Sequence, residues 1–103
     1  MNNLMIDLET MGKNKDAPIV SIGAVFFTPE TGDIGQEFYA VVSLDSAMKQ
    51  GATPDGDTIL WWLKQSPEAP AAICIDDTLS ISDALSELNH FINRHADNTK
   101  YLK

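Results

Sequence analysis

A short apolar segment, residues 4–9 (Leu-Met-Ile-Asp-Leu-Glu), most strongly constrains how this chain can fold, because a β-prone run here carries two carboxylates. Side chains alternate between the two faces of a strand, so Asp7 and Glu9 share one face, with their Cα atoms about 6.5 to 7 Å apart. Oxygen ligands of this kind suit hard divalent cations such as Mg²⁺ or Mn²⁺. The pattern predicts a metal site. The alternative is a half-exposed edge strand whose acids are solvated.

Length and charge limit the classes of protein to consider. The chain has 103 residues, which allows one domain, and 44% of them are hydrophobic, enough for a modest core. The formal net charge is −8, from 7 basic and 15 acidic residues. This charge argues against binding to nucleic acid through a basic face alone. A nuclease remains compatible with it, because metal ions can supply positive charge at the phosphate.

Cys74 is the single cysteine and lies in an apolar run. It cannot form an intramolecular disulfide, so nothing indicates an oxidising compartment, and its neighbours predict a buried side chain. No charged and then apolar leader precedes residue 4, and no apolar run approaches the roughly 18 residues of a membrane span. We therefore expect neither a signal peptide nor a membrane helix, and a cytoplasmic protein.

Three β-prone runs precede the helical patterns. The expected strands cover about 4–9, 18–28 and 35–44, with turn residues at 29–33 between the last two. The second run is nearly all apolar, which predicts a central strand buried on both faces. The expected helices cover about 54–65, 67–73 and 81–95. These elements predict a single α/β domain over 1–103, a three-stranded antiparallel meander followed by helices.

Local signals predict where the helices begin. Thr53 is the predicted N-cap of the first helix, with Pro54 in its first helical position. Ser66 is the predicted cap of the second helix and Ser80 that of the third.

Three segments carry a resemblance to a known family. They are residues 5–12 (Met-Ile-Asp-Leu-Glu-Thr-Met-Gly), 18–25 (Pro-Ile-Val-Ser-Ile-Gly-Ala-Val) and 58–69 (Thr-Ile-Leu-Trp-Trp-Leu-Lys-Gln-Ser-Pro-Glu-Ala). Together they resemble the opening of DEDD-type 3′-to-5′ exonucleases of the ribonuclease H-like fold, in the branch of exonuclease VIII-like prophage proteins and related exoribonucleases. The resemblance covers nearly the whole chain but only the first half or so of the family's domain. It implies a truncated ribonuclease H-like fold whose later strands are missing.

The same resemblance implies a two-metal mechanism acting at the 3′ end of DNA or RNA. In that mechanism Asp7 would bridge two Mg²⁺ or Mn²⁺ ions and Glu9 would hold one of them. The backbone of Thr10, Met11 and Gly12 would approach the terminal nucleotide, with Gly12 allowing close contact.

Two adjacent tryptophans are the other candidates for a role in the site. Trp61 is turned about 100° from Trp62 around the helix axis, so one ring is expected in the core and the other at the surface. Trp61 is the candidate for stacking on a base of the substrate. The alternative is that both rings only pack within the protein.

The family's later acidic motifs and its catalytic base have no counterpart here, although Lys100-Tyr101-Leu102-Lys103 resembles the start of the next strand. One hypothesis is therefore the N-terminal portion of a metal-dependent 3′-to-5′ exonuclease, inactive as this chain. The other is a non-catalytic folded module or prophage remnant that acts through self-association. In both, residues 4–9 would form an open sheet edge, which predicts a homo-oligomer.

Overall fold

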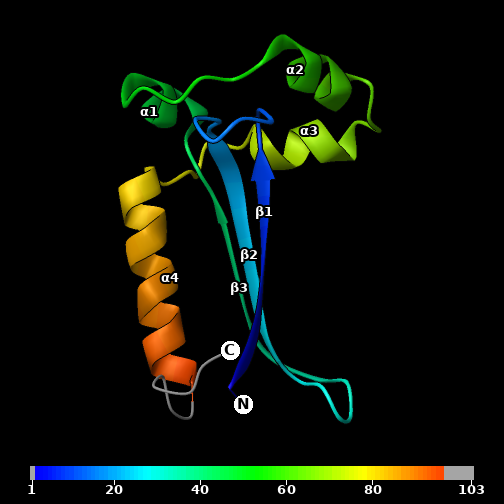
Figure 1. Cartoon of the computed structure of the whole chain (residues 1–103), viewed down its shortest axis with the longest axis vertical. Helices are drawn as coiled ribbons and strands as arrows, with labels where there is room; N and C mark the ends of the chain where they lie inside the picture. Colours follow the sequence, from blue (N-terminus) through cyan, green and yellow to red (C-terminus); the bar gives the residue numbers. More distant parts are fainter. Residues whose placement is uncertain (1, 97–103) are drawn as a thin grey trace.

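The computed structural model describes residues 2–96 and begins with an antiparallel sheet. Its strands are β1 (Asn3–Thr10), β2 (Ile19–Thr28) and β3 (Asp33–Val41), in the order β1-β2-β3. Four helices follow: α1 (Leu44–Lys49), α2 (Gly56–Leu63), α3 (Glu68–Ile73) and α4 (Ile81–His95). The expected three-stranded meander followed by helices is therefore confirmed (Figure 1). The segment 100–103, proposed as the start of a further strand, lies outside the described residues.

Strand register decides which side chains meet on the sheet. Asp7 pairs with Gly23 across β1 and β2, and Gly23 pairs in turn with Tyr39 of β3. The next row on the same face of the sheet pairs Glu9 with Ser21. Residues directly opposite each other in an antiparallel pair project from the same face of the sheet. Both acids of β1 therefore project from the face that also carries Tyr39.

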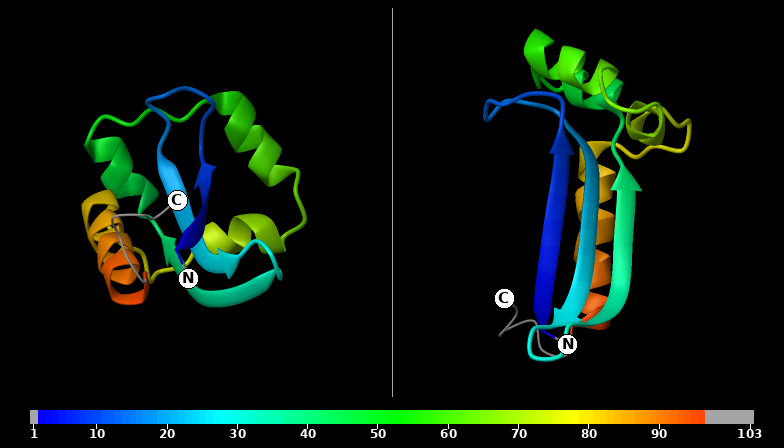
Figure 2. Two further views of the ribbon diagram at one scale, coloured as in Figure 1. Left: turned by 60° about the horizontal axis from the view of Figure 1, so that its bottom comes forward. Right: turned by 90° about the vertical axis from the view of Figure 1, so that its right-hand side faces the viewer.

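Helix α4 covers the opposite face of the sheet and supplies much of the core (Figure 2). Its residue Phe91 packs against Phe26 and Phe38, with ring centroids 5.4 and 5.5 Å apart. Ala84, fully buried in the same helix, packs against Ile22 of β2. Burying each large apolar side chain contributes about 1.5 to 3 kcal/mol, so α4 fixes the sheet from this side.

A second cluster closes the end of the sheet where β1 stops and where α1, α2 and α3 gather (Figure 1). Met11, Val20 and Trp62 are buried together there, with Ile73 of α3 packed against them. This cluster joins the connector after β1 to two helices that lie more than 40 residues further along the chain.

Two of the predicted helix starts are wrong. Helix α2 is capped by Asp55, whose side chain accepts a hydrogen bond from the backbone N–H of Thr58, and not by Thr53. Pro54 therefore precedes the helix. Helix α3 begins after Pro67 and has no side-chain cap, so Ser66 does not cap it. Ser80 caps α4 as predicted, accepting from the N–H of Asp83.

Three further expectations need correction. The return strand ends at Val41 and not at 44, because Ser43 caps α1 and turns the chain into that helix. Strand β2 is central, but on the face opposite α4 its residues Gly23 and Val25 are only partly buried. Cys74 is exposed where it caps the end of α3, whereas the neighbouring Ile73 is the residue of this apolar run that packs against the core.

Apolar side chains remain exposed along the outer edge of the sheet. Strand β1 has a neighbour on one side only among the described residues, and its Ile6 and Leu8 are 47% and 48% exposed. On α2, Leu60 and Leu63 are also exposed. None of the helices within residues 2–96 has the length and apolar character that crossing a membrane would require.

Candidate active site

Asp7 and Glu9 open into a cavity of about 310 Å³ on the face of the sheet opposite α4. Both carboxylates are exposed to solvent. The cavity is bounded by residues of β1, β2, β3, α2 and α3: Asp7, Glu9, Ser21, Gly23, Tyr39, Trp62, Ala69, Ala72 and Ile73. Its size lies at the lower end of the range for ligand pockets, about 300 to 1,000 Å³.

The walls of this cavity differ in chemistry. The sheet supplies its acidic and polar floor, while α3 supplies an apolar wall of Ala69, Ala72 and Ile73. These three residues share one helical face, because they are spaced by three and four positions. A ligand in the cavity would therefore meet carboxylates on one side and small apolar groups on the other.

Trp62 fixes the backbone immediately after the acids. Its indole Nε1–H donates to the carbonyl oxygen of Thr10 at 3.1 Å, and its ring is 93% buried, since only 7% of its surface is exposed. The Thr10 hydroxyl donates to the carbonyl of Gly12 at 2.8 Å, which tightens the turn. Met11 places its side chain in the core beside Trp62. The segment that the family resemblance assigns to substrate contact is thus anchored to α2.

Asp55 is a second anchor for the same connector. Its carboxylate accepts a hydrogen bond from the backbone N–H of Lys13 at 2.9 Å, and its own N–H donates to the carbonyl of Met11 at 3.2 Å. Partial desolvation raises the pKa of Asp55, but hydrogen bonds from Thr58 and Lys13 together outweigh it and hold that pKa below its ordinary value. These bonds place residue 55 outside the helix, which explains why α2 begins later than its sequence suggested.

Gly12 is required by this packing. A Cβ atom added there would lie 2.8 Å from the Cβ of Ala17 and 2.9 Å from Oδ1 of Asp55. Real Cβ atoms essentially never approach so closely. The sequence suggested that Gly12 allows a close contact, and in the structure Ala17 and Asp55 make that contact. Contact of Gly12 with a substrate stays a prediction.

We expect Gly12→Ala to lower the free energy of unfolding by about 1 to 3 kcal/mol, because the extra methyl group would displace Asp55 or Ala17. Urea unfolding followed by circular dichroism measures the change. Gly56→Ala is the matched control, since a Cβ at Gly56 meets nothing within 4 Å. Equal stability of the Gly12→Ala variant and the wild type would show that the connector adapts freely.

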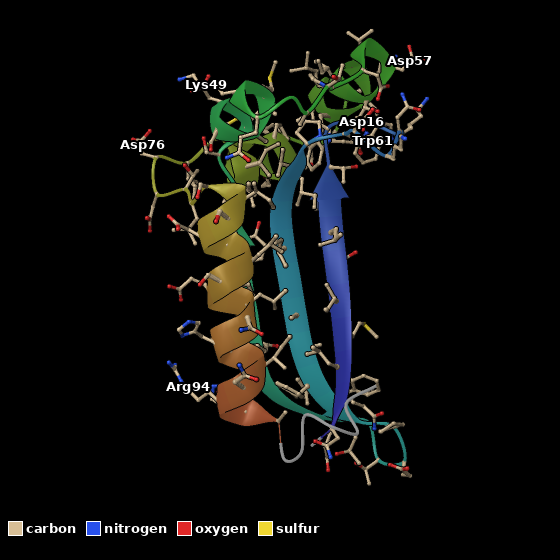
Figure 3. All side chains as sticks on the ribbon, turned by 60° about the vertical axis from the view of Figure 1, so that its left-hand side comes forward. Asp16, Lys49, Asp57, Trp61, Asp76 and Arg94 are labelled. Carbon is tan, nitrogen blue, oxygen red and sulfur yellow. The ribbon has the colours of Figure 1, made fainter. Side chains whose placement is uncertain are left out.

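Trp61 lies apart from the acids. Its ring is 54% exposed and borders a separate cavity of about 340 Å³ with Gly12, Lys13, Asp57 and Thr58. Figure 3 shows Trp61 and Asp57 at the end of the molecule that α2 forms. The expectation of one surface and one core tryptophan is confirmed, with Trp61 at the surface and Trp62 in the core. The structure therefore brings Asp7 and Glu9 together in one cavity, and Gly12 and Trp61 in another.

Few side chains that could bind a metal ion lie near Asp7 and Glu9. Within residues 2–96, no group of three or more histidine, cysteine, aspartate or glutamate side chains lies together in a way that could hold a metal ion. Asp7 and Glu9 provide hard oxygen ligands on one face, which fits Mg²⁺ or Mn²⁺ in type. Two carboxylates alone leave most coordination positions to other ligands.

Comparison with known proteins shows to which family this chain belongs. Residues 2–103 match the family described as the 3′-5′ exoribonuclease Rv2179c-like domain. The chain belongs to this 3′-5′ exonuclease family. A protein of Enterobacteria phage T4 named exodeoxyribonuclease is similar as well, 30% identical over 103 residues, covering 92% of this chain and 45% of its own length. The chain thus spans less than half the length of this relative.

In this exonuclease family member, Asp7 and Glu9 are the residues of the cavity that the sequence predicted as site residues. The sequence predicted one core tryptophan without the bond of Trp62 to the connector, and it predicted Tyr39 and Gly23 only as strand residues. A glycine inside an otherwise largely apolar strand was the available signal, since it often marks close approach of a ligand or backbone. Tyr39 offered no signal, because its place in the same row as Asp7 and Gly23 depends on the register of two strand pairs.

Proposed function

We propose that this chain carries part of the active site of a metal-dependent 3′-to-5′ exonuclease with a ribonuclease H-like fold. In this proposal Asp7 and Glu9 hold Mg²⁺ or Mn²⁺ and the substrate is the 3′ end of a nucleic acid. The observation that carries it is the pair of carboxylates on one face of β1, opening into a cavity of about 310 Å³. Membership of an exonuclease family supports the reaction class.

The residues of the chain divide the work of this site. Bound divalent cations would supply positive charge at the phosphate and activate water. Asp7 and Glu9 would hold those cations on the β1 side of the cavity. The Thr10–Gly12 backbone, anchored to α2 through the hydrogen bond from Trp62 to Thr10, would approach the terminal nucleotide. Trp61, exposed at the neighbouring cavity, offers a ring on which a further base stacks.

Metal binding is the direct test of the proposal. We expect Mn²⁺ to bind at Asp7 and Glu9 with a Kd on the order of 10⁻³ M, because affinity falls with few charged ligands and a site open to water. Titration followed by ¹H–¹⁵N NMR should broaden the amide signals of β1 around these residues first. Asp7→Asn and Glu9→Gln should each abolish that selective broadening.

Glu30→Gln is the matched control, because it removes one negative charge from the exposed turn between β2 and β3. It should leave the broadening around Asp7 unchanged. Broadening that survives Asp7→Asn, or that falls equally with Glu30→Gln, would show that Mn²⁺ binds only to the acidic surface in general.

A second candidate function is self-association without catalysis. The open edge of β1 and the apolar side chains at Ile6 and Leu8 favour it, because an unpaired edge is a template for pairing with another strand. The exposed Leu60 and Leu63 of α2 add a further apolar surface.

We therefore expect this chain to form a dimer or larger assembly through the β1 edge. Light scattering at rising protein concentration measures it. Ile6→Lys should shift the chain toward monomer, because a charged edge strand resists pairing. Ile34→Lys, at the exposed start of β3, is the control. A monomer at every concentration would contradict the prediction.

A further inference from the structure

The outer edge of β3 lacks a partner strand over most of its length. In the part of the chain that the structure describes, β3 pairs with β2 alone, and Figure 2 shows it at the outer side of the sheet. The segment between α3 and α4 covers only one end of this edge. There the N–H of Leu79 donates to the carbonyl oxygen of Val41 at 2.9 Å, and the N–H of Ser43 donates to the carbonyl of Leu79 at 2.7 Å. Leu79 therefore takes the place of a parallel neighbouring strand, but only where β3 ends.

The hydrogen bonds at this end show which backbone groups face the open edge. The N–H of Val42 donates toward β2, whereas the carbonyl of Val41 accepts a bond from the other side. In an antiparallel pair every second residue exchanges hydrogen bonds with its partner, and the residues between direct their N–H and C=O groups the other way. The register with β2 is regular from Glu37 to Val41. Glu37 and Tyr39 therefore direct their backbone groups away from β2, and each offers one donor and one acceptor to a further strand.

A cavity of about 370 Å³ lies along this edge. It is bordered by the consecutive β3 residues 38–41, whose side chains alternate between the two faces, so it opens beside the strand and not over one face. Its apolar lining includes Phe38, Ala40, Ile75 and Leu79. The volume lies near the lower end of the range for ligand pockets, which suits side chains of an extended peptide better than a folded domain.

Two carboxylates without a countercharge border the same cavity. Asp77, before α4, and Glu87, on α4, are both exposed, and neither has a salt-bridge partner within residues 2–96. Glu37 adds an exposed carboxylate on β3, and none of the described residues that border the cavity is a lysine or an arginine. This edge therefore disfavours a second copy of the chain, whose net charge is −8, and favours a basic partner.

We propose that the β3 edge and the segment between α3 and α4 form a docking site for an extended basic peptide of another protein. The peptide adds a strand to the sheet by bonding to the outward-facing backbone groups of β3. Its apolar side chains enter the cavity, and its basic side chains pair with Asp77 and Glu87. In this mode of recognition main-chain bonds give affinity and side-chain pockets give specificity. The proposal is independent of the proposed function, because neither Asp7 nor Glu9 borders this cavity.

The test titrates the full 103-residue chain with a seven-residue peptide that alternates lysine with valine, blocked at both ends, and follows binding by ¹H–¹⁵N NMR. Amide signals of Glu37, Tyr39 and Leu79 should shift together. At saturation the amides of Glu37 and Tyr39 should exchange with deuterium more slowly. The same peptide N-methylated at its three central residues keeps its charges but loses main-chain donors, so it should bind about tenfold more weakly. A peptide with glutamate in place of lysine should not bind.

Asp77→Asn and Glu87→Gln should each weaken binding of the lysine peptide about two- to fivefold, the range for exposed ion pairs. Glu30→Gln, in the turn between β2 and β3, is the matched control and should leave the affinity unchanged. These surface variants should retain the wild-type unfolding midpoint in urea, and the N-methylated peptide tests the proposal without any variant.

Three results would each overturn the proposal. One is an absence of binding, and another is equal affinity for the N-methylated peptide, which would mean that lysine only neutralises the acidic surface. The third is slower amide exchange at Tyr39 when the concentration of the chain alone is raised, because a second copy would then occupy the β3 edge.

Discussion

Replacing Trp62 with alanine is expected to lower the free energy of unfolding by about 3 to 5 kcal/mol, the usual range for removing a buried aromatic ring. The ring is 7% exposed and packs with Met11 and Val20. Its loss would also leave the carbonyl of Thr10 without the indole donor. Domains of this size have a total stability of about 5 to 15 kcal/mol, so the variant should be close to unfolding at 25 °C. Urea unfolding followed by circular dichroism measures the loss.

The neighbouring ring provides a matched control. Trp61→Ala removes the same atoms from a side chain that is 54% exposed, and it should cost much less than Trp62→Ala. The rings touch edge to face with centroids 5.5 Å apart, so a cost of about 0.5 to 1.5 kcal/mol remains expected. Trp62→Phe separates packing from the hydrogen bond, because it keeps an aromatic ring and removes the N–H. Equal losses for the two alanine variants would contradict the assignment of Trp62 to the core.

The 103-residue chain is expected to release no nucleotides from a 3′ end, although it belongs to an exonuclease family. Its described residues bring together two carboxylates and no third metal-binding side chain. Groups that act as one catalytic unit are strongly non-additive, so an incomplete set should give activity at the background level. A longer protein that contains this chain and supplies the remaining acids should be active and should lose its activity on Asp7→Asn.

The assay incubates both proteins with labelled single strands and duplexes, of DNA and of RNA, with Mg²⁺ or Mn²⁺. Both sugars are needed, because the matched family is described as an exoribonuclease and the phage T4 relative is named an exodeoxyribonuclease. Glu30→Gln is the control for general loss of charge. Metal-dependent release of mononucleotides by the short chain, abolished by Asp7→Asn, would show that two carboxylates suffice or that subunits complement one another. Activity of the longer protein that ignores Asp7 would overturn the proposed function.

Local periodicity predicted the parts of this protein that depend on nearby residues. Alternation along β1 placed Asp7 and Glu9 on one face, and the register with β2 agrees. The apolar stripe of α4 and its Ser80 cap were also predicted, because a helix cap and an apolar helical face depend only on residues close together in the sequence.

The features that the sequence did not predict depend on interactions between distant segments. Thr53 and Pro54 make a plausible helix start locally, but the bonds of Asp55 to the 11–18 connector move the start to Gly56. The cavity beside Asp7 could not be predicted, because its wall comes from α3 and its aromatic end from Tyr39. No pattern within one segment of the sequence specifies which other segments will lie next to it.

The bonds that hold the connector after β1 have a consequence for how the protein is made. Lys13 and Asp55 are 42 positions apart in the chain, and Thr10 and Trp62 are 52 apart. Contacts between distant residues form only after the entropy of closing a long loop has been overcome. During synthesis from the N-terminus, the three strands can therefore pair while the rim beside the acids is still unformed. That rim acquires its shape only after α2 has left the ribosome, so the acid pair has no ordered surround until then.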